Sequence, residues 1–146
     1  MSSNALVNIT NVHKFFKRGS ERVDVLNGVN LSVPKGDFLA LMGPSGSGKT
    51  TLLNLMGGLD QPTSGTVEVA GVQIDKLGGS ALSKWRSQNI GFVFQLYNLL
   101  PVLSAEKNVE LPLLLTNLGS SERKKRSAIA LKLVGLADRA RHLPRQ

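Results

Sequence analysis

One stretch decides the fold of this chain, and it reads Gly43-Pro44-Ser45-Gly46-Ser47-Gly48-Lys49-Thr50. It matches G-x-x-x-x-G-K-[ST], the pattern of a phosphate-binding loop. The loop follows the apolar run 38–42 and opens an expected helix over residues 49–56. A continuous apolar run of this kind is typical of a strand buried on both faces of a parallel sheet. The strand–loop–helix order that the motif requires is therefore expected here.

Each residue type in the loop suits the dense negative charge of a triphosphate. Gly46 and Gly48 allow a tight turn and a close approach of the backbone to phosphate oxygens. We expect the backbone N–H groups from Gly46 to Thr51 to point inward, aided by the positive end of the helix dipole. Lys49 is a cation for the β- and γ-phosphates, and Thr50 offers a hydroxyl to Mg²⁺. The rival interpretation is a glycine-rich turn without a ligand.

The composition fits a globular chain of one domain. The 146 residues contain no cysteine, which excludes disulfides and thiolate metal sites. No apolar run approaches the ~18 residues that span a bilayer, and the N-terminus lacks the regions of a signal peptide. The net charge of +8 gathers near residues 14–18 and 123–145, where we expect solvated faces. Nucleic-acid binding is not expected, because it would need aromatic residues interleaved with the charges, and the cluster at 123–145 contains none.

Hydrophobic patterning predicts an α/β fold. Short strands are expected at residues 6–12, 23–26, 29–33 and 66–74 in an antiparallel sheet, and buried strands at 38–42 and 90–94. Helices are expected at residues 49–56, 80–88, 105–115 and 121–134, with Pro112 interrupting the third.

The residues around the loop resemble ATP-binding-cassette (ABC) transporter ATPases. The similarity lies in residues 43–53 and in residues 57–65, Gly-Gly-Leu-Asp-Gln-Pro-Thr-Ser-Gly. Residues 90–95, Ile-Gly-Phe-Val-Phe-Gln, look like the strand that ends in the Q-loop glutamine of that family. Residues 98–101 and 106–113 are similar to the lipoprotein-releasing and macrolide-export subgroup.

The resemblance implies a fold, ligands and partners. The fold would be an ABC-type P-loop core with an antiparallel β subdomain over residues 1–95 and part of a helical subdomain over residues 96–146. The ligands would be ATP and Mg²⁺. The partners would be a transmembrane permease and, in the full-length form, a second ATPase domain in a homodimer. The protein would then be cytoplasmic and peripheral on the inner face of the plasma membrane.

The resemblance also assigns residues. ATP would be bound by the loop from Gly43 through Thr51, and Phe16 would stack on adenine, with Phe15 as the near alternative. Gln95 would touch Mg²⁺ or the attacking water, so that Lys49 and Gln95 carry the catalytic roles and Thr50 and Gln95 the metal. Without the resemblance, both phenylalanines would be interpreted as ordinary core residues.

Later motifs of the family do not occur in these 146 residues. There is no Leu-Ser-Gly-Gly-Gln and no apolar strand ending in Asp-Glu, and His13 and His142 lie in the wrong regions for the switch histidine. We therefore expect a truncated cassette, ending just before its signature loop, that binds Mg-ATP weakly and hydrolyses little of it alone. The alternatives are a non-transport ABC-type interaction or regulatory protein and a nucleic-acid-binding P-loop protein.

Overall fold

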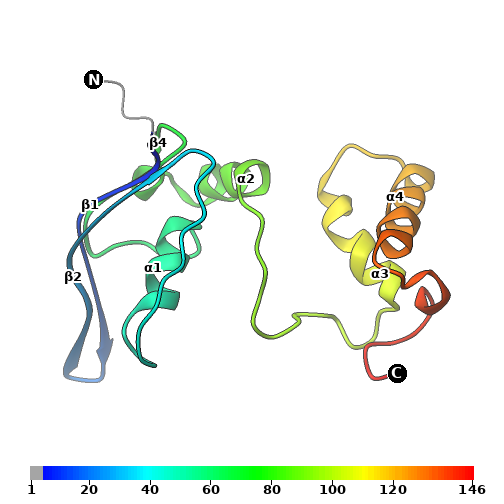
Figure 1. Ribbon diagram of the computed structural model, residues 1–146, viewed down its shortest axis with the longest axis horizontal. Coiled ribbons are helices and arrows are strands. Elements are labelled where there is room, and N and C mark those ends of the chain that lie inside the picture. The colour runs from blue at the N-terminus through cyan, green and yellow to red at the C-terminus, as the bar shows by residue number, and fades with distance from the viewer. Residues whose placement is uncertain (1–4) are drawn as a thin grey trace. The chain divides into compact units, whose positions relative to one another are not determined.

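The computed structural model describes residues 5–146, which divide into two compact units that join between Gly91 and Phe92. The first unit contains the sheet and the glycine-rich loop, and the second consists of helices (Figure 1). The segment around the join has neither helix nor strand. The subdomain boundary expected after Gln95 falls within this same segment.

Four strands of the first unit form one antiparallel sheet in the order β2-β1-β3-β4. The strands are β1 (Ala5–Arg18), β2 (Glu21–Pro34), β3 (Ser64–Val69) and β4 (Val72–Gln73). The central strand β1 pairs on both sides, so that Ile9 faces Leu31 of β2 and Val67 of β3.

The turns between the strands of this sheet contain residues with positive φ angles, most of which are glycines. Gly19 has a φ of +63° in the turn between β1 and β2. Ala70 and Gly71 have φ values of +52° and +75° between β3 and β4. Two successive positive φ angles are characteristic of the two-residue turn that matches the twist of a hairpin.

The first hairpin is longer than the sequence predicts. Residues 23–26 and 29–33 were expected as separate strands, but they belong to the single strand β2. Strand β2 continues through the residues between these two stretches because its register with β1 is irregular: Val12 faces Val29, and Lys14 faces Leu26. Gly28, with a φ of +64°, lies in this irregular stretch. A bulge of this kind lets a strand continue through residues that break its alternation.

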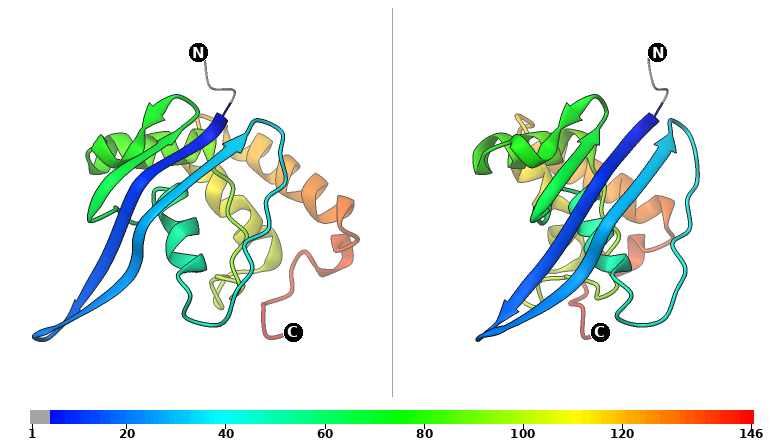
Figure 2. Two further views of the ribbon diagram at one scale, coloured as in Figure 1. Left: turned by 60° about the vertical axis from the view of Figure 1, so that its left-hand side comes forward. Right: turned by 90° about the vertical axis from the view of Figure 1, so that its left-hand side faces the viewer.

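Two helices cover one face of the sheet, as both views in Figure 2 show. They are α1 (Lys49–Met56) and α2 (Gly79–Asn89), and a short 3-10 turn, η1 (Ile74–Lys76), precedes α2. The buried core that joins sheet and helices consists of Ile9, Val12, Leu26, Leu52, Leu55, Val67, Val69, Ile74, Leu82 and Trp85. The expected helices at 49–56 and 80–88 are confirmed.

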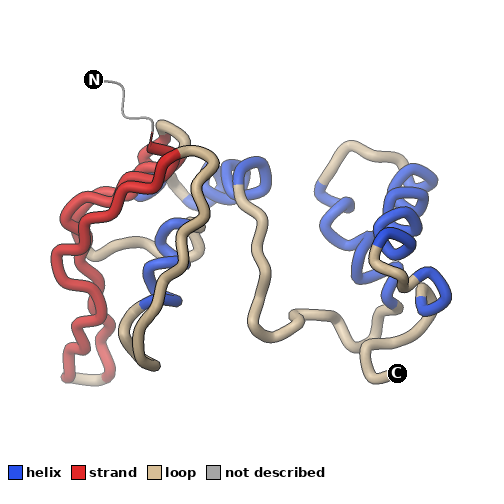
Figure 3. The backbone as a smooth tube through the Cα atoms, in the orientation of Figure 1, coloured by secondary structure: helices blue, strands red, loops and turns tan. Residues whose placement is uncertain are grey.

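The two expected buried strands are wrong. Residues 38–42 and 90–94 form no strand, and Figure 3 shows the stretch between β2 and α1 as loop. Phe38 and Met42 are 93% and 91% exposed. The physical reason is that a strand needs a neighbour for its N–H and C=O groups. The sheet pairings among residues 5–146 are those of the antiparallel sheet alone.

The second unit is built from two helices and two short 3-10 turns. These are α3 (Ala105–Glu110), η2 (Leu111–Leu115), α4 (Ser120–Leu133) and η3 (Ala137–Arg139). Pro112 ends the α-helical geometry, as predicted, because it lies in the first turn of η2. The two helices are joined by a hydrogen bond of 2.7 Å from the buried Ser127 hydroxyl to the carbonyl of Glu106.

Glu110 is a buried carboxylate between these helices. Lys107 Nζ lies 2.7 Å from one carboxylate oxygen, and Arg123 Nε lies 3.5 Å from the other. The hydrogen bond from Lys107 holds the pKa of Glu110 below its usual value. Within residues 5–146, no helix is both long and apolar enough to cross a membrane.

Candidate nucleotide-binding site

The glycine-rich loop has a backbone that only glycine adopts readily at three positions. Gly43, Gly46 and Gly48 have φ values of +152°, +81° and +87°. The N–H of Ser47 donates a 3.3 Å hydrogen bond to the carbonyl of Pro44 and closes a tight turn between them. The spacing of glycines in the sequence is therefore explained by the path of the chain.

Gly48 is needed for a second reason, which is a close approach. A Cβ at this position would lie 2.9 Å from Leu26 Cδ2 and 3.0 Å from the carbonyl oxygen of Val25. Leu26 and Val25 belong to the irregular stretch of β2. The loop is thus held against the hairpin backbone at the residue that precedes α1.

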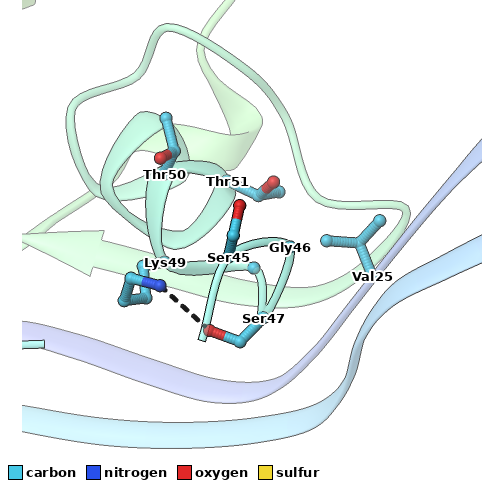
Figure 4. Close-up of a pocket in the computed structure, with 8 residues that line it drawn as sticks. Val25, Ser45, Gly46, Ser47, Lys49, Thr50 and Thr51 are labelled. Carbon is cyan, nitrogen blue, oxygen red and sulfur yellow. Dashed lines mark hydrogen bonds between the residues drawn. The ribbon is translucent and has the colours of Figure 1, made fainter. Parts of the chain in front are cut away.

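The N-terminus of α1 is open toward a pocket. Gly48 is its N-cap, and in the described part of the chain no side chain caps it. The first N–H groups of a helix have no partner within the helix, and together with the dipole they favour an anion. The pocket has a volume of about 340 Å³ and is lined by Val25, Ser45, Gly46, Ser47, Gly48, Lys49, Thr50 and Thr51 (Figure 4).

Lys49 holds its ammonium group on the loop itself. Its Nζ donates to the carbonyls of Gly43 at 2.9 Å and Pro44 at 2.7 Å and to the hydroxyl of Ser47 at 3.2 Å. Figure 4 shows the last of these contacts beside the pocket. Gly43 and Pro44 therefore contribute to the site through their carbonyl oxygens, which hold the ammonium of Lys49. The cation is kept next to the helix N-terminus, where a phosphate oxygen would meet both.

Thr50 brings one of the hydroxyl groups that line this pocket. Its side chain is exposed in the first turn of α1, so the hydroxyl is available to a metal. Mg²⁺ prefers oxygen ligands and is commonly held by few protein groups together with substrate phosphates and water. Residues 5–146 contain no group of three or more His, Cys, Asp or Glu side chains that could hold a metal.

Phe16 lies on the face of the hairpin that carries the loop. It is 45% exposed and faces Val23 across the strands. Lys14, two residues earlier, points to the same face, and its ammonium lies 4.8 Å from the centre of the Phe16 ring. The residue opposite Lys14 is Leu26, whose side chain contacts the loop. Phe16 thus lies on the same face of β1 as the buried residues, toward the end of the strand where that face becomes exposed.

Phe15 differs from Phe16 in its surroundings. Successive residues of a strand point to opposite faces, so Phe15 points away from the face of Phe16. The guanidinium of Arg22 covers its ring at 4.2 Å from the centre. Of the two aromatic residues that the sequence offered, Phe16 is therefore the one on the side of the loop.

Gln95 belongs to the second unit, in the segment that precedes α3, and its side chain is exposed. Just before it, the rings of Phe92 and Phe94 stack with their centres 5.7 Å apart. The structure thus brings the loop residues together in one pocket of the first unit, while Gln95 is part of the other unit.

The sequence analysis did not identify the positions of two residues of the first unit. Val25 lines the pocket because a register irregularity of β2 lies there. Lys14 appeared only as part of a basic cluster, yet it is 9% exposed and paired with Asp60 at 2.7 Å. The pattern Lys-Phe-Phe gives no local signal for a partner so far along the chain.

The fold and site define a P-loop nucleotide-binding domain, and comparison with known proteins specifies its family. The sequence profile of the family described as ABC transporter matches residues 26–146. This chain belongs to the ABC transporter ATP-binding family.

Individual relatives agree with this assignment. The chain is 45% identical to the uncharacterized ABC transporter ATP-binding protein YknY of Bacillus subtilis, over 97% of this chain and 61% of that protein. It is 43% identical to the macrolide export ATP-binding/permease protein MacB 1 of Yersinia pestis bv. Antiqua, over 97% of this chain and 22% of that protein. The chain thus spans about three fifths of YknY.

A solved structure confirms the fold class. The ATP-binding cassette MJ0796 of Methanocaldococcus jannaschii, solved as a dimer in a post-hydrolysis state bound to ADP and Pi, matches with a TM-score of 0.87 and 44% identity. The match covers 96% of this chain and 62% of that one. The α/β, ABC-type fold predicted from the sequence is confirmed, with the antiparallel sheet and helices found above.

Proposed function

We propose that this chain binds Mg-ATP at the loop from Gly43 to Thr51 and serves as the ATP-binding subunit of an ABC transporter. The observation that carries the proposal is the uncapped N-terminus of α1, which opens on a pocket beside the ammonium of Lys49. A triphosphate would replace the loop carbonyls as the partner of that ammonium. Charge-assisted hydrogen bonds of this kind are the strong ones.

The remaining site residues receive their roles in the same proposal. Phe16 stacks on the nucleobase, since its exposed ring lies on the loop face of the hairpin. Thr50 gives its hydroxyl to Mg²⁺. Gln95 supplies an amide oxygen to Mg²⁺ or to the attacking water, as its place in the family motif suggests. When bound, the magnesium ion supplies charge neutralisation of the phosphates.

Coupling to transport belongs to the proposal as well. The subunit would act with a transmembrane permease, at the inner face of the plasma membrane, in export or extraction of a substrate. It would pair with a second ATPase domain. Support comes from two relatives, since MacB 1 is named as an ATP-binding/permease protein and MJ0796 is a dimer in its solved structure.

The experiment that tests binding uses calorimetry with Mg-ATP on the wild-type chain and on Lys49→Ala. A hydrogen bond to a charged group contributes ~1.5–3 kcal/mol, so the affinity should fall by about 10- to 100-fold. Lys84→Ala is the matched control, since Lys84 is exposed on α2 of the same unit. Equal ATP affinity in the wild type and Lys49→Ala would refute the proposed site.

Hydrolysis is expected to be negligible for these 146 residues alone. Phosphoryl transfer depends on groups that position the attacking water and stabilise charge, and the sequence contains neither the signature motif nor an acidic strand end. Steady phosphate release that Lys49→Ala abolishes would overturn this expectation.

A further inference from the structure

Lys14 is a buried cation whose position is fixed by two oxygen atoms. Its Nζ donates to Asp60 Oδ1 at 2.7 Å and to the carbonyl oxygen of Gln61 at 2.8 Å. Lys14 is only 9% exposed. Lysine is rarely buried unless its ammonium has a partner, and these two oxygen atoms are the partners here. Most lysine ammonium groups move freely with their four-carbon stem, whereas this one is held between two acceptors.

The same ammonium lies against the ring of Phe16. The distance from Nζ to the ring centre is 4.8 Å, within the range at which a cation is attracted to an aromatic face. Because the ammonium is fixed, it restricts the ring from one side. The ring remains 45% exposed, so part of its surface is open to a stacking partner.

Asp60 connects this arrangement to the phosphate loop. The N–H groups of Leu59 and Asp60 donate to the carbonyl of Asn54, in the last turn of α1, at 2.8 and 3.3 Å. The helix α1 therefore carries the phosphate pocket at its N-terminus and the anchor of Lys14 just beyond its C-terminus. An eight-residue helix is a rigid spacer of about 12 Å.

We propose that Lys14 is a positioning residue, which holds the ring of Phe16 at a fixed place relative to the phosphate pocket so that it can stack on the base of a bound nucleotide. The inference rests on the proposed nucleotide site. A ring ordered in advance loses less conformational freedom on binding, so the bound base gains affinity. Asp60 and the carbonyl of Gln61 hold the ammonium of Lys14 in the position that this role requires.

A purely structural role is the rival explanation. The pair of Lys14 and Asp60 ties β1 to the loop after α1, where the N–H of Thr63 also donates to the carbonyl of His13 at 2.9 Å. If this were its whole role, loss of Lys14 would weaken every ligand of the pocket together. The two roles therefore differ in what happens to a ligand that has phosphates and no base.

The test compares Mg-ATP with magnesium tripolyphosphate, which reaches the phosphate pocket alone. Affinities of both are measured by calorimetry for the wild type, Lys14→Met, Phe16→Ala and the double variant. We expect Lys14→Met to weaken ATP by about three- to tenfold, from the usual strength of a cation–aromatic contact. Tripolyphosphate should bind as in the wild type. The double variant should bind ATP no more weakly than Phe16→Ala.

Three further variants separate the contributions. Lys14→Arg should keep near-normal ATP affinity, since it retains a cation for Asp60. Asp60→Asn should give a smaller loss in the same direction, because it loosens Lys14 without removing it. Arg22→Met is the matched control: it removes the cation from the ring of Phe15, on the opposite face of the strand, and should leave ATP binding unchanged.

Parallel loss of ATP and tripolyphosphate in Lys14→Met would overturn the positioning role, as would full additivity with Phe16→Ala. Failure of the proposed nucleotide site gives a different result, because the wild type would then bind neither ligand or Lys49→Ala would bind both normally. Fluorescence of Trp85, the only tryptophan, reports whether each variant retains the folded first unit.

Discussion

Substitution of Gly48 by alanine tests how the loop is attached to the hairpin. The change adds one methyl group at a position with a φ of +87° and with two atoms at 2.9 and 3.0 Å from the new carbon. One of these atoms is Leu26 Cδ2, the end of a flexible side chain. The other is the carbonyl oxygen of Val25, which cannot move without the backbone of β2.

The expected magnitude has two parts. A left-handed backbone costs a residue with a Cβ roughly 1–2 kcal/mol, and overpacking adds roughly 1–3 kcal/mol. We therefore expect Gly48→Ala to lower the free energy of unfolding by about 2–5 kcal/mol. Gly46 is the matched control, because its φ is +81° and a Cβ there meets nothing within 4 Å. Gly46→Ala should show the first part alone.

Urea unfolding provides the assay. Trp85 lies in the core of the first unit, so its fluorescence follows the unfolding of the part that contains the loop. The midpoint and slope give the free energy for the wild type and for both variants. Equal losses in Gly46→Ala and Gly48→Ala would refute the close approach to the carbonyl of Val25.

Two further predictions concern the core and the second unit. Leu55→Ala should lower the free energy of unfolding by roughly 2–5 kcal/mol, because Leu55 is fully buried. Leu53 on the same helix is exposed and should tolerate alanine. Similar losses in the two variants would contradict the packing of Leu55 in the core. Lys107→Met should raise the pKa of Glu110 in a carbon NMR titration, whereas Lys132→Met should not. Because the pKa of Glu110 is lowered in the folded state, its ion pair stabilises the second unit above pH 4.5 and ceases to do so as the pH falls through the folded pKa. An unchanged pKa of Glu110 in Lys107→Met would show that Lys107 is not the cause.

The phosphate loop could be predicted from sequence because its information is local. The glycines, Lys49 and the helix that follows are adjacent in the chain, and α1 has the bounds that the apolar pattern predicts. The same pattern misjudged residues 38–42 because apolar character identifies a segment that tends to be buried. It does not provide the neighbouring strand that would bury it.

The features that sequence reasoning missed depend on distant residues. The ion pair of Lys14 with Asp60 joins positions 46 residues apart. The faces on which Phe15 and Phe16 lie depend on the register of β1 with β2, which irregular pairing near Leu26 makes difficult to predict. A shift of one residue in register moves every side chain to the opposite face of a sheet. The family resemblance named Phe16 before Phe15, and the folded hairpin adds the physical difference, which is that the two rings lie on opposite faces of β1.

The central claim is that backbone N–H groups at the start of α1 bind the phosphates of ATP, and amide NMR tests it most directly. Addition of Mg-ATP to the ¹⁵N-labelled chain should shift the signals from Gly46 to Thr51 most strongly. The same titration with Lys49→Ala should produce much smaller shifts. Unchanged loop signals at saturating Mg-ATP, or shifts confined to other parts of the chain, would contradict the account.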